Sequence, residues 1–255
     1  MDVCRGTRLE VVASACSERG SRALNEDSFM IAGDLMCVSD GIGGAPHGDI
    51  VSRVCCGALA DEWRREPADE DGMVRAFCAA DDLVSRVSGY LGKGSGATLV
   101  AAARCGEKMV FGCVGDSAAW LLPPAGGLVR VFEASGRLRE AGSALDAAMG
   151  YRMLQGGGRA CVRVATAPML PGMKVLLCTD GVWSQLPHRH IGFILSNHDD
   201  PYAAAYRIVR EAVSAGGEAG DNATALVACA REVRADRDQQ TPFSFEDALT
   251  ERSAG

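Results

Sequence analysis

Three short apolar segments of this chain stop abruptly at an aspartate, and this pattern constrains the fold more than any other feature. The segments are LMCVSD, which ends at Asp40, MVFGCVGD, which ends at Asp116, and KVLLCTD, which ends at Asp180. Apolar runs of this length between turn residues are typical of buried strands. A fourth aspartate, Asp221, shortly precedes the apolar segment ATALVACA. Because strands of packed sheets bring distant positions to a common edge, we expect the four carboxylates to converge.

Strand and helix patterns occur in separate blocks along the chain, which favours an α+β fold. Apolar residues recur at helical spacing over 49–65, 69–91 and 202–215. We expect strands at 11–16, 28–32, 35–39, 98–104, 108–114, 118–122, 128–132, 160–165, 174–178 and 224–230. The four strands between 98 and 132 are separated by short turns, so we expect them to form one antiparallel meander.

Length and composition indicate one catalytic domain, which we place at residues 1–231. Residues 232–255 are charged and poorly patterned, so we expect a mobile charged tail there. The start MDVCRGTRLE lacks the profile of a secretory signal.

The 11 cysteines include no CxxC motif and many lie inside apolar runs. We therefore expect buried free thiols, no disulfides and a cytoplasmic protein.

The formal net charge of −7 and the isoelectric point near 5.2 oppose nucleic-acid binding, because a polyanion would be repelled without a concentrated basic patch. No apolar stretch approaches the roughly 18 consecutive apolar residues that a membrane span requires. We expect neither a nucleic-acid nor a membrane partner, and we expect a monomer.

Carboxylates that gather at one place repel one another, so the predicted cluster requires cations. Ligands with hard oxygen atoms select Mg²⁺ or Mn²⁺. Asp40 and Asp180 are each followed by a glycine, Gly41 and Gly181, which permits a tight turn and a close approach of the backbone carbonyl to an ion. A single Asp-Gly pair most often marks only a turn, whereas the repeated pattern indicates a metal centre.

The chain resembles the metal-dependent PP2C-type (PPM) serine/threonine protein phosphatases, in particular their bacterial single-domain members. Six motifs carry the resemblance, in the family's order: RALNED at 22–27, DGIGGAPHG at 40–48, GSGATL at 94–99, GDS at 115–117, TDG at 179–181 and GDNAT at 220–224. Each motif is weak alone, but six in order over most of the chain form a specific signal. The resemblance implies a four-layer α-β-β-α sandwich with two central antiparallel sheets.

The resemblance also implies which residues hold the metal ions. Asp40 would bridge two Mn²⁺ or Mg²⁺ ions, with the Gly41 carbonyl on one of them and Asp180 and Asp221 on the other. Asp27, with or without Glu26, would bind a metal directly or through water.

Two further roles follow from the same resemblance. Asp116 would complete a third, weaker metal site together with Asp180. Arg22 would clamp the substrate phosphate, because its planar fork of donors matches phosphate oxygens.

The implied reaction is hydrolysis of phosphoserine and phosphothreonine on proteins by a metal-activated water, with the catalytic roles on Arg22, Asp40 and Asp180. The partner would be a phosphoprotein, either a Ser/Thr kinase or a target of one. Two alternatives remain open at this point. One is a pseudophosphatase that binds phosphoproteins without cleaving them, and the other is a hydrolase of small phosphate esters.

Some positions depart from the family pattern. Ile42 follows Asp40-Gly41, where some eukaryotic relatives carry a histidine proposed as the general acid. His47 lies nearby, but a loop histidine is more often a surface residue. Ala118 follows GDS, where family members usually have arginine. These departures leave the leaving-group acid and the substrate preference open.

Overall fold

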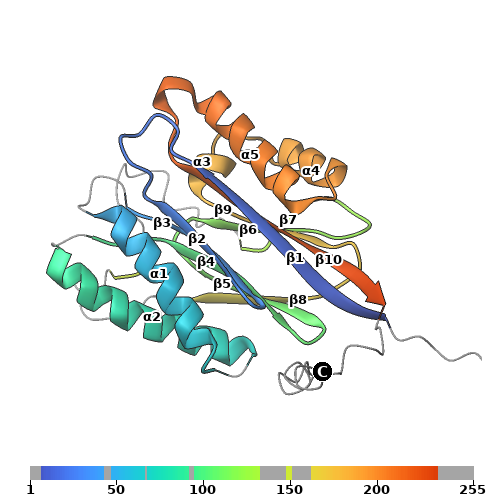
Figure 1. Ribbon diagram of the computed structural model, residues 1–255, viewed down its shortest axis with the longest axis horizontal. Helices are drawn as coiled ribbons and strands as arrows, with labels where there is room; N and C mark the ends of the chain where they lie inside the picture. The colour runs from blue at the N-terminus through green and yellow to red at the C-terminus, as the bar shows by residue number, and fades with distance from the viewer. Residues whose placement is uncertain are drawn as a thin grey trace, which may run out of the picture.

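The computed structural model describes residues 7–42, 47–66, 68–91, 95–132, 148–150 and 162–234. Two antiparallel sheets of five strands each pack face to face, and helices cover the outer face of each sheet (Figure 1). The expected α+β class and the four-layer α-β-β-α sandwich are therefore confirmed.

The first sheet has the strand order β1-β10-β9-β6-β7. Its strands are β1 (Thr7–Glu18), β10 (Ala223–Arg234), β9 (Lys174–Cys178), β6 (Ala118–Leu122) and β7 (Val129–Arg130). The helices on its outer face are α3 (Asp180–Trp183), α4 (His188–Asn197) and α5 (Pro201–Gly216), and α5 leads into the short 3-10 helix η1 (Gly217–Ala219).

The second sheet has the strand order β2-β3-β4-β5-β8. Its strands are β2 (Asp27–Ala32), β3 (Leu35–Asp40), β4 (Leu99–Cys105), β5 (Lys108–Val114) and β8 (Arg163–Pro168). Two long helices, α1 (Gly48–Trp63) and α2 (Glu70–Leu91), cover its outer face.

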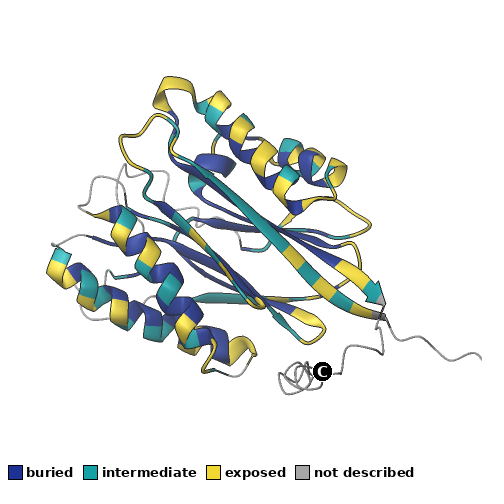
Figure 2. Ribbon diagram, viewed as in Figure 1, coloured by how far each residue is buried: buried dark blue, intermediate teal, exposed yellow. Residues whose placement is uncertain are grey.

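The central strands are apolar on both faces because each lies between two packed layers. In β3, Leu35 and Cys37 pack toward α1 and α2, whereas Met36 and Val38 pack toward the other sheet. Figure 2 shows the same burial along the inner strands, with exposed residues on the outer sides of the helices. Burial on both faces explains why these segments are continuous apolar runs without polar alternation.

The expectation of one meander between residues 98 and 132 is wrong. β4 pairs with β5 in the second sheet, while β6 pairs with β7 and β9 in the first sheet. The chain crosses between the sheets at 115–117, where Gly115 has a positive φ of 94°. Sequence patterns also failed to indicate α3 and α4, and the strand expected at 160–165 is β8, at Arg163–Pro168.

β10 continues to Arg234, so the fold extends slightly past the boundary expected at residue 231. The domain limits and the tail remain a prediction, because residues 235–255 lie outside the described part of the chain.

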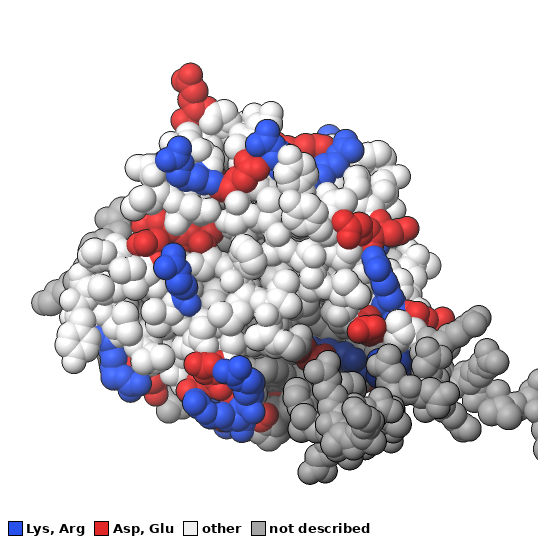
Figure 3. All heavy atoms as spheres, in the orientation of Figure 1, with Lys and Arg blue, Asp and Glu red and all other residues white. Residues whose placement is uncertain are grey.

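Within the described part, nine cysteines are free thiols, and Cys37, Cys113 and Cys178 are buried as expected. No helix among the described residues is long and apolar enough to cross a membrane. Acidic and basic side chains are interspersed on the face drawn in Figure 3.

Candidate metal centre

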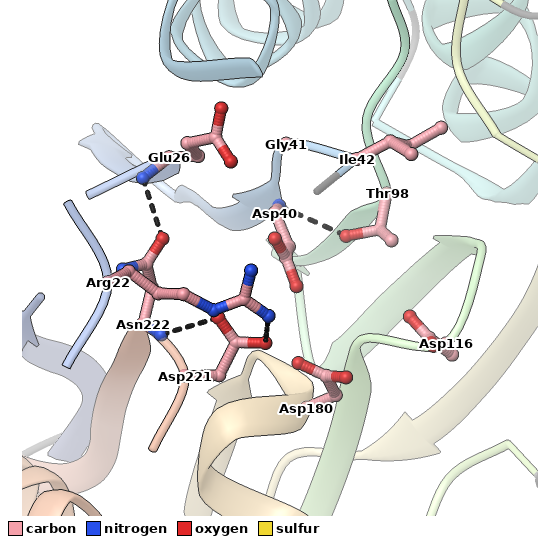
Figure 4. A pocket seen from close by; sticks show the side chains of 10 residues that line it. All are labelled: Arg22, Glu26, Asp40, Gly41, Ile42, Thr98, Asp116, Asp180, Asp221 and Asn222. Carbon is pink, nitrogen blue, oxygen red and sulfur yellow. Dashed lines mark hydrogen bonds and ion pairs between the residues drawn. The ribbon is translucent and has the colours of Figure 1, made fainter. Parts of the chain in front are cut away.

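A pocket of about 280 Å³ opens where strands of both sheets end, and the four aspartates expected to converge line it together. The lining residues are Arg22, Glu26, Asp40, Gly41, Ile42, Thr98, Asp116, Asp180, Asp221 and Asn222. Figure 4 shows Asp40, Asp180 and Asp221 pointing toward one another from separate elements, with Asp116 to one side.

Each carboxylate reaches the pocket from a different place in the fold. Asp40 is the last residue of β3, and Asp27, the first residue of β2, is its direct partner across the antiparallel pair. Asp116 lies in the turn between β5 and β6, and Asp180 is the first residue of α3, just past the end of β9. Asp221 lies in the loop before β10. Strand pairing and sheet packing thus assemble residues that are far apart in the sequence.

Buried threonines hold this assembly together. The Thr179 hydroxyl donates to Asp27 Oδ2 at 2.9 Å and accepts from the Thr224 backbone N–H at 3.0 Å, which ties the first sheet to the second. Thr98 Oγ1 accepts from the Asp40 backbone N–H at 3.0 Å. Sequence reasoning quoted these threonines inside the motifs but assigned them no role. The sequence feature that could have pointed to them is a polar residue at or next to the end of an apolar strand.

Asn222 is a further functional residue that sequence reasoning missed. Its side-chain Oδ1 accepts from the Glu26 backbone N–H at 2.8 Å. Its Nδ2 donates to the carbonyls of Arg19 at 2.7 Å and Leu24 at 2.9 Å. The Asn222 side chain is buried, and it fixes both ends of the loop that carries Arg22 between β1 and β2.

Replacing Asn222 with alanine is expected to lower the free energy of unfolding by about 1–3 kcal/mol, because three part-buried backbone groups lose the partner that holds them. Urea unfolding measures this loss. Asn197→Ala is the matched control, since Asn197 is exposed and its side chain donates to the Phe193 carbonyl at 2.8 Å, within its own helix. An equal loss in both variants would show that Asn222 does not hold the loop.

Burial raises the pKa of four carboxyl groups, and the neighbouring negative charges add to this effect; the four are Asp27, Asp40, Asp116 and Asp180. The pKa of Asp27 rises to about 7 and that of Asp116 to about 6. The pKa of Asp40 is well above its ordinary value because of burial and then the charges of Asp27 and Asp180. The charge of Asp180 also raises the pKa of Asp27, so these carboxyl groups repel one another when they are ionised.

The donor chemistry of this cluster fits a hard divalent cation. Oδ1 of Asp27 and Oδ1 of Asp180 are buried and receive no hydrogen bond from any described donor, so each retains a free acceptor. In the described residues, no three acidic, histidine or cysteine side chains already surround a single point as an ion requires. Cation binding therefore requires the side chains to reorient, and the bound cation would neutralise their mutual repulsion.

The other predicted positions have distinct places. The Arg22 Nη2 donates to Asp221 Oδ2 at 2.7 Å, so Arg22 faces the pocket as an ion-pair partner of a predicted metal ligand. Gly41 lies so close to α1 that a Cβ atom would be 2.5 Å from the Gly48 backbone. Ile42 lines the pocket, whereas His47 is exposed at the start of α1 and does not line it.

The Protein phosphatase 2C family profile matches residues 17–211 of this chain. Among characterised relatives, the serine/threonine protein phosphatase PstP of Mycobacterium tuberculosis is 30% identical over 236 residues. This match covers 84% of the present chain and 44% of the relative, so the chain spans less than half of that protein's length.

Solved structures share the fold. The catalytic domain of the serine/threonine protein phosphatase PstP, in complex with two manganese ions, superposes with a TM-score of 0.75 at 26% identity, covering 88% of this chain and 100% of that one. PppA, a key regulatory component of T6SS in Pseudomonas aeruginosa, superposes with a TM-score of 0.73 at 26% identity. The superposition covers 89% of this chain and 100% of PppA.

Proposed function

The chain belongs to the protein phosphatase 2C family, and on that premise we propose that it hydrolyses phosphoserine and phosphothreonine esters on proteins. The observation that carries this proposal is the pocket itself. Four aspartates from four separate elements line it beside one arginine, with Asp27 directly behind Asp40. The described lining residues form an acidic, oxygen-rich site in which Arg22 supplies a positive charge suited to a phosphate group.

The residues that hold the ions in this proposal are Asp27, Asp40, Asp180, Asp221 and the carbonyl of Gly41. A pair of Mn²⁺ or Mg²⁺ ions bound there would supply positive charge for the phosphate oxygens and lower the pKa of a water molecule near phosphorus. The raised pKa values of Asp27, Asp40 and Asp180 support this assignment, since such a cluster gains most from a neutralising cation.

A weaker third ion is proposed beside Asp116 and Asp180. Burial raises the pKa of Asp116 most, and the negative charge of Asp180 is the next largest cause. The two carboxylates therefore act on each other electrostatically. The manganese complex of the PstP catalytic domain holds two ions, and it supports the main site in this proposal but not the third.

The chain's own residues position the substrate. The Arg22 guanidinium offers paired N–H donors to the phosphate oxygens, and Asn222 holds the loop on which Arg22 lies. Ile42 supplies an apolar wall. The described lining residues include no histidine, so we assign protonation of the departing serine or threonine oxygen to solvent.

The proposed substrate is a phosphoprotein, and the reaction reverses the transfer that a Ser/Thr protein kinase performs. A pseudophosphatase that only binds phosphoprotein has no need for a complete set of ionisable metal ligands. Here Asp40, Asp116, Asp180 and Asp221 line the pocket, and Asp27 is paired with Asp40 across the neighbouring strand. Hydrolysis of small phosphate esters uses the same centre, and the choice of substrates in an assay separates it from protein dephosphorylation.

Protein stripped with a chelator is expected to be inactive and to recover hydrolysis of a phosphothreonine peptide by at least about a hundredfold when Mn²⁺ is added, because transition-state charge is then stabilised. The assay includes p-nitrophenyl phosphate and free phosphoserine. Hydrolysis of the small esters without the peptide would indicate a metabolite hydrolase. If the protein binds the phosphopeptide in the presence of Mn²⁺ but hydrolyses none of the substrates, it is a pseudophosphatase that only binds phosphoproteins.

A further inference from the structure

Arg22 and Asp221 form an ion pair at the mouth of the pocket, where a phosphate clamp and a metal ligand are both proposed. Nη2 of Arg22 donates to Asp221 Oδ2 at 2.7 Å (Figure 4). The two side chains are 50% and 36% exposed, so neither is locked by surrounding atoms. Arg22 lies in the loop between β1 and β2, and Asp221 lies in the loop before β10, so the pair joins two separate loops.

Only one end of the Asp221 carboxylate is fixed by the backbone. Oδ1 accepts from the Asn222 backbone N–H at 2.8 Å, whereas the partner of Oδ2 is the Arg22 guanidinium. A divalent cation that binds this carboxylate competes with Arg22 for Oδ2 and repels its positive charge. The same ion pair occupies N–H donors of Arg22 that a phosphate group would use, and it leaves a carboxylate beside them.

The positive charge of Arg22 also acts on other acidic groups of the site. Glu26, Asp40 and Asp180 line the same pocket as Arg22. In the metal-free protein the guanidinium thus compensates part of the negative charge that cations otherwise neutralise.

Resting on the proposed function, we propose that Arg22 is an internal counter-ion that exchanges partners. In the metal-free protein it is held by Asp221. Cation binding at Asp221 releases the guanidinium, and the released guanidinium then binds the substrate phosphate. Cation binding therefore promotes phosphate binding, because the two ligands bind the two partners of one ion pair and each of them breaks that pair.

The first test measures cation binding without turnover. Isothermal titration of Mn²⁺ into chelator-stripped protein is expected to show about two- to fivefold tighter binding for Arg22→Gln than for the natural protein, the range of an exposed ion pair. Arg19→Gln is the matched control, because Arg19 lies on the same loop but donates to the Ala23 carbonyl and does not line the pocket. Unchanged or weaker binding in Arg22→Gln would overturn the proposal, as would an equal gain in Arg19→Gln.

The second test measures binding of inorganic phosphate to metal-free protein. Asp221→Asn is expected to bind phosphate several-fold more tightly than the natural protein, because Arg22 is free, and the double variant Asp221→Asn/Arg22→Gln is expected to lose this gain. Asp116→Asn removes the same charge from the same pocket without touching Arg22. An equal gain in Asp116→Asn would show a general charge effect and refute the exchange.

Circular dichroism of each variant verifies that it is folded before titration. Neither test depends on catalysis, so the two ideas fail separately. A protein without phosphatase activity that shows both shifts refutes the proposed function and keeps the exchange of partners. An active phosphatase that shows neither shift does the reverse.

Discussion

Asp40→Asn is expected to lower the hydrolysis of a phosphothreonine peptide by about a hundred- to a thousandfold, because the proposed bridging ligand loses its charge and one ligating oxygen. Asp40 lies at the end of β3, opposite Asp27 in the paired strand, and it lines the pocket together with Asp180. Steady-state kinetics at saturating Mn²⁺ measure the effect. Near-normal turnover would mean that the metal assignment is wrong.

The same variant is expected to be at least as stable as the natural protein when metal is absent. The pKa of Asp40 is raised in the folded state, so the native protein holds a proton that the unfolded chain releases. The contribution of Asp40 to the free energy of unfolding is therefore lost as the pH rises from the ordinary pKa of an aspartate through the raised pKa of Asp40. Asparagine carries no charge, so at pH 8 we expect the metal-free variant to melt about 2–4 °C higher, or roughly 1 kcal/mol, with no such advantage near pH 4.

Asp34→Asn is the control for both measurements. It makes the same chemical change at an exposed turn between β2 and β3, away from the pocket lining. We expect unchanged turnover and an unchanged melting temperature. A metal-free Asp40→Asn protein that melts well below the natural one at pH 8 would show that Asp40 is a structural residue and does not carry a destabilising charge.

Gly181→Ala is expected to destabilise the protein by about 3 kcal/mol or more and to abolish tight Mn²⁺ binding, because the new methyl group has no space. A Cβ atom at Gly181 would lie 2.0 Å from the Asn222 carbonyl oxygen. Both groups belong to backbone that cannot rotate away. The substitution therefore separates α3, which carries Asp180, from the loop that carries Asp221. Urea unfolding and Mn²⁺ titration measure the two effects.

Gly57→Ala is the matched control for this substitution. Gly57 lies within α1, and a Cβ atom there would meet nothing within 4 Å. Alanine stabilises a helix interior relative to glycine, so a gain of about 0.5–1 kcal/mol is expected. If the two variants had similar stability, the close approach of α3 to Asn222 would not matter for the fold.

Local patterns in the sequence were sufficient where a segment is bounded by turn residues and buried on both faces. The ranges expected at 108–114, 118–122 and 174–178 coincide with β5, β6 and β9. The two long helices begin and end within two residues of the expected positions. These elements follow from apolar periodicity, which is a local property of the chain.

Pairing between strands could not be obtained in the same way. β4-β5 and β6-β7 are similar hairpins in sequence, yet they belong to different sheets. Which sheet a strand joins depends on the layers that cover it, and these layers come from distant parts of the chain. The short helix α3 is missed for a related reason, because a single turn of helix at Asp180–Trp183 is too short for a periodic pattern.

The sequence by itself determined the identity of the acidic residues, the strands that they terminate and the family whose motifs they form. Only the tertiary structure decided that Asp27 lies across from Asp40, that Thr179 links the two sheets and that Arg22 is held by Asp221. The physical reason is that apolar periodicity and turn chemistry act over a few neighbouring residues. Contacts between the loops at 19–26 and 217–222 arise only after β1 has paired with β10, when hydrogen-bonding and charged groups nearly two hundred positions apart first come within reach of each other.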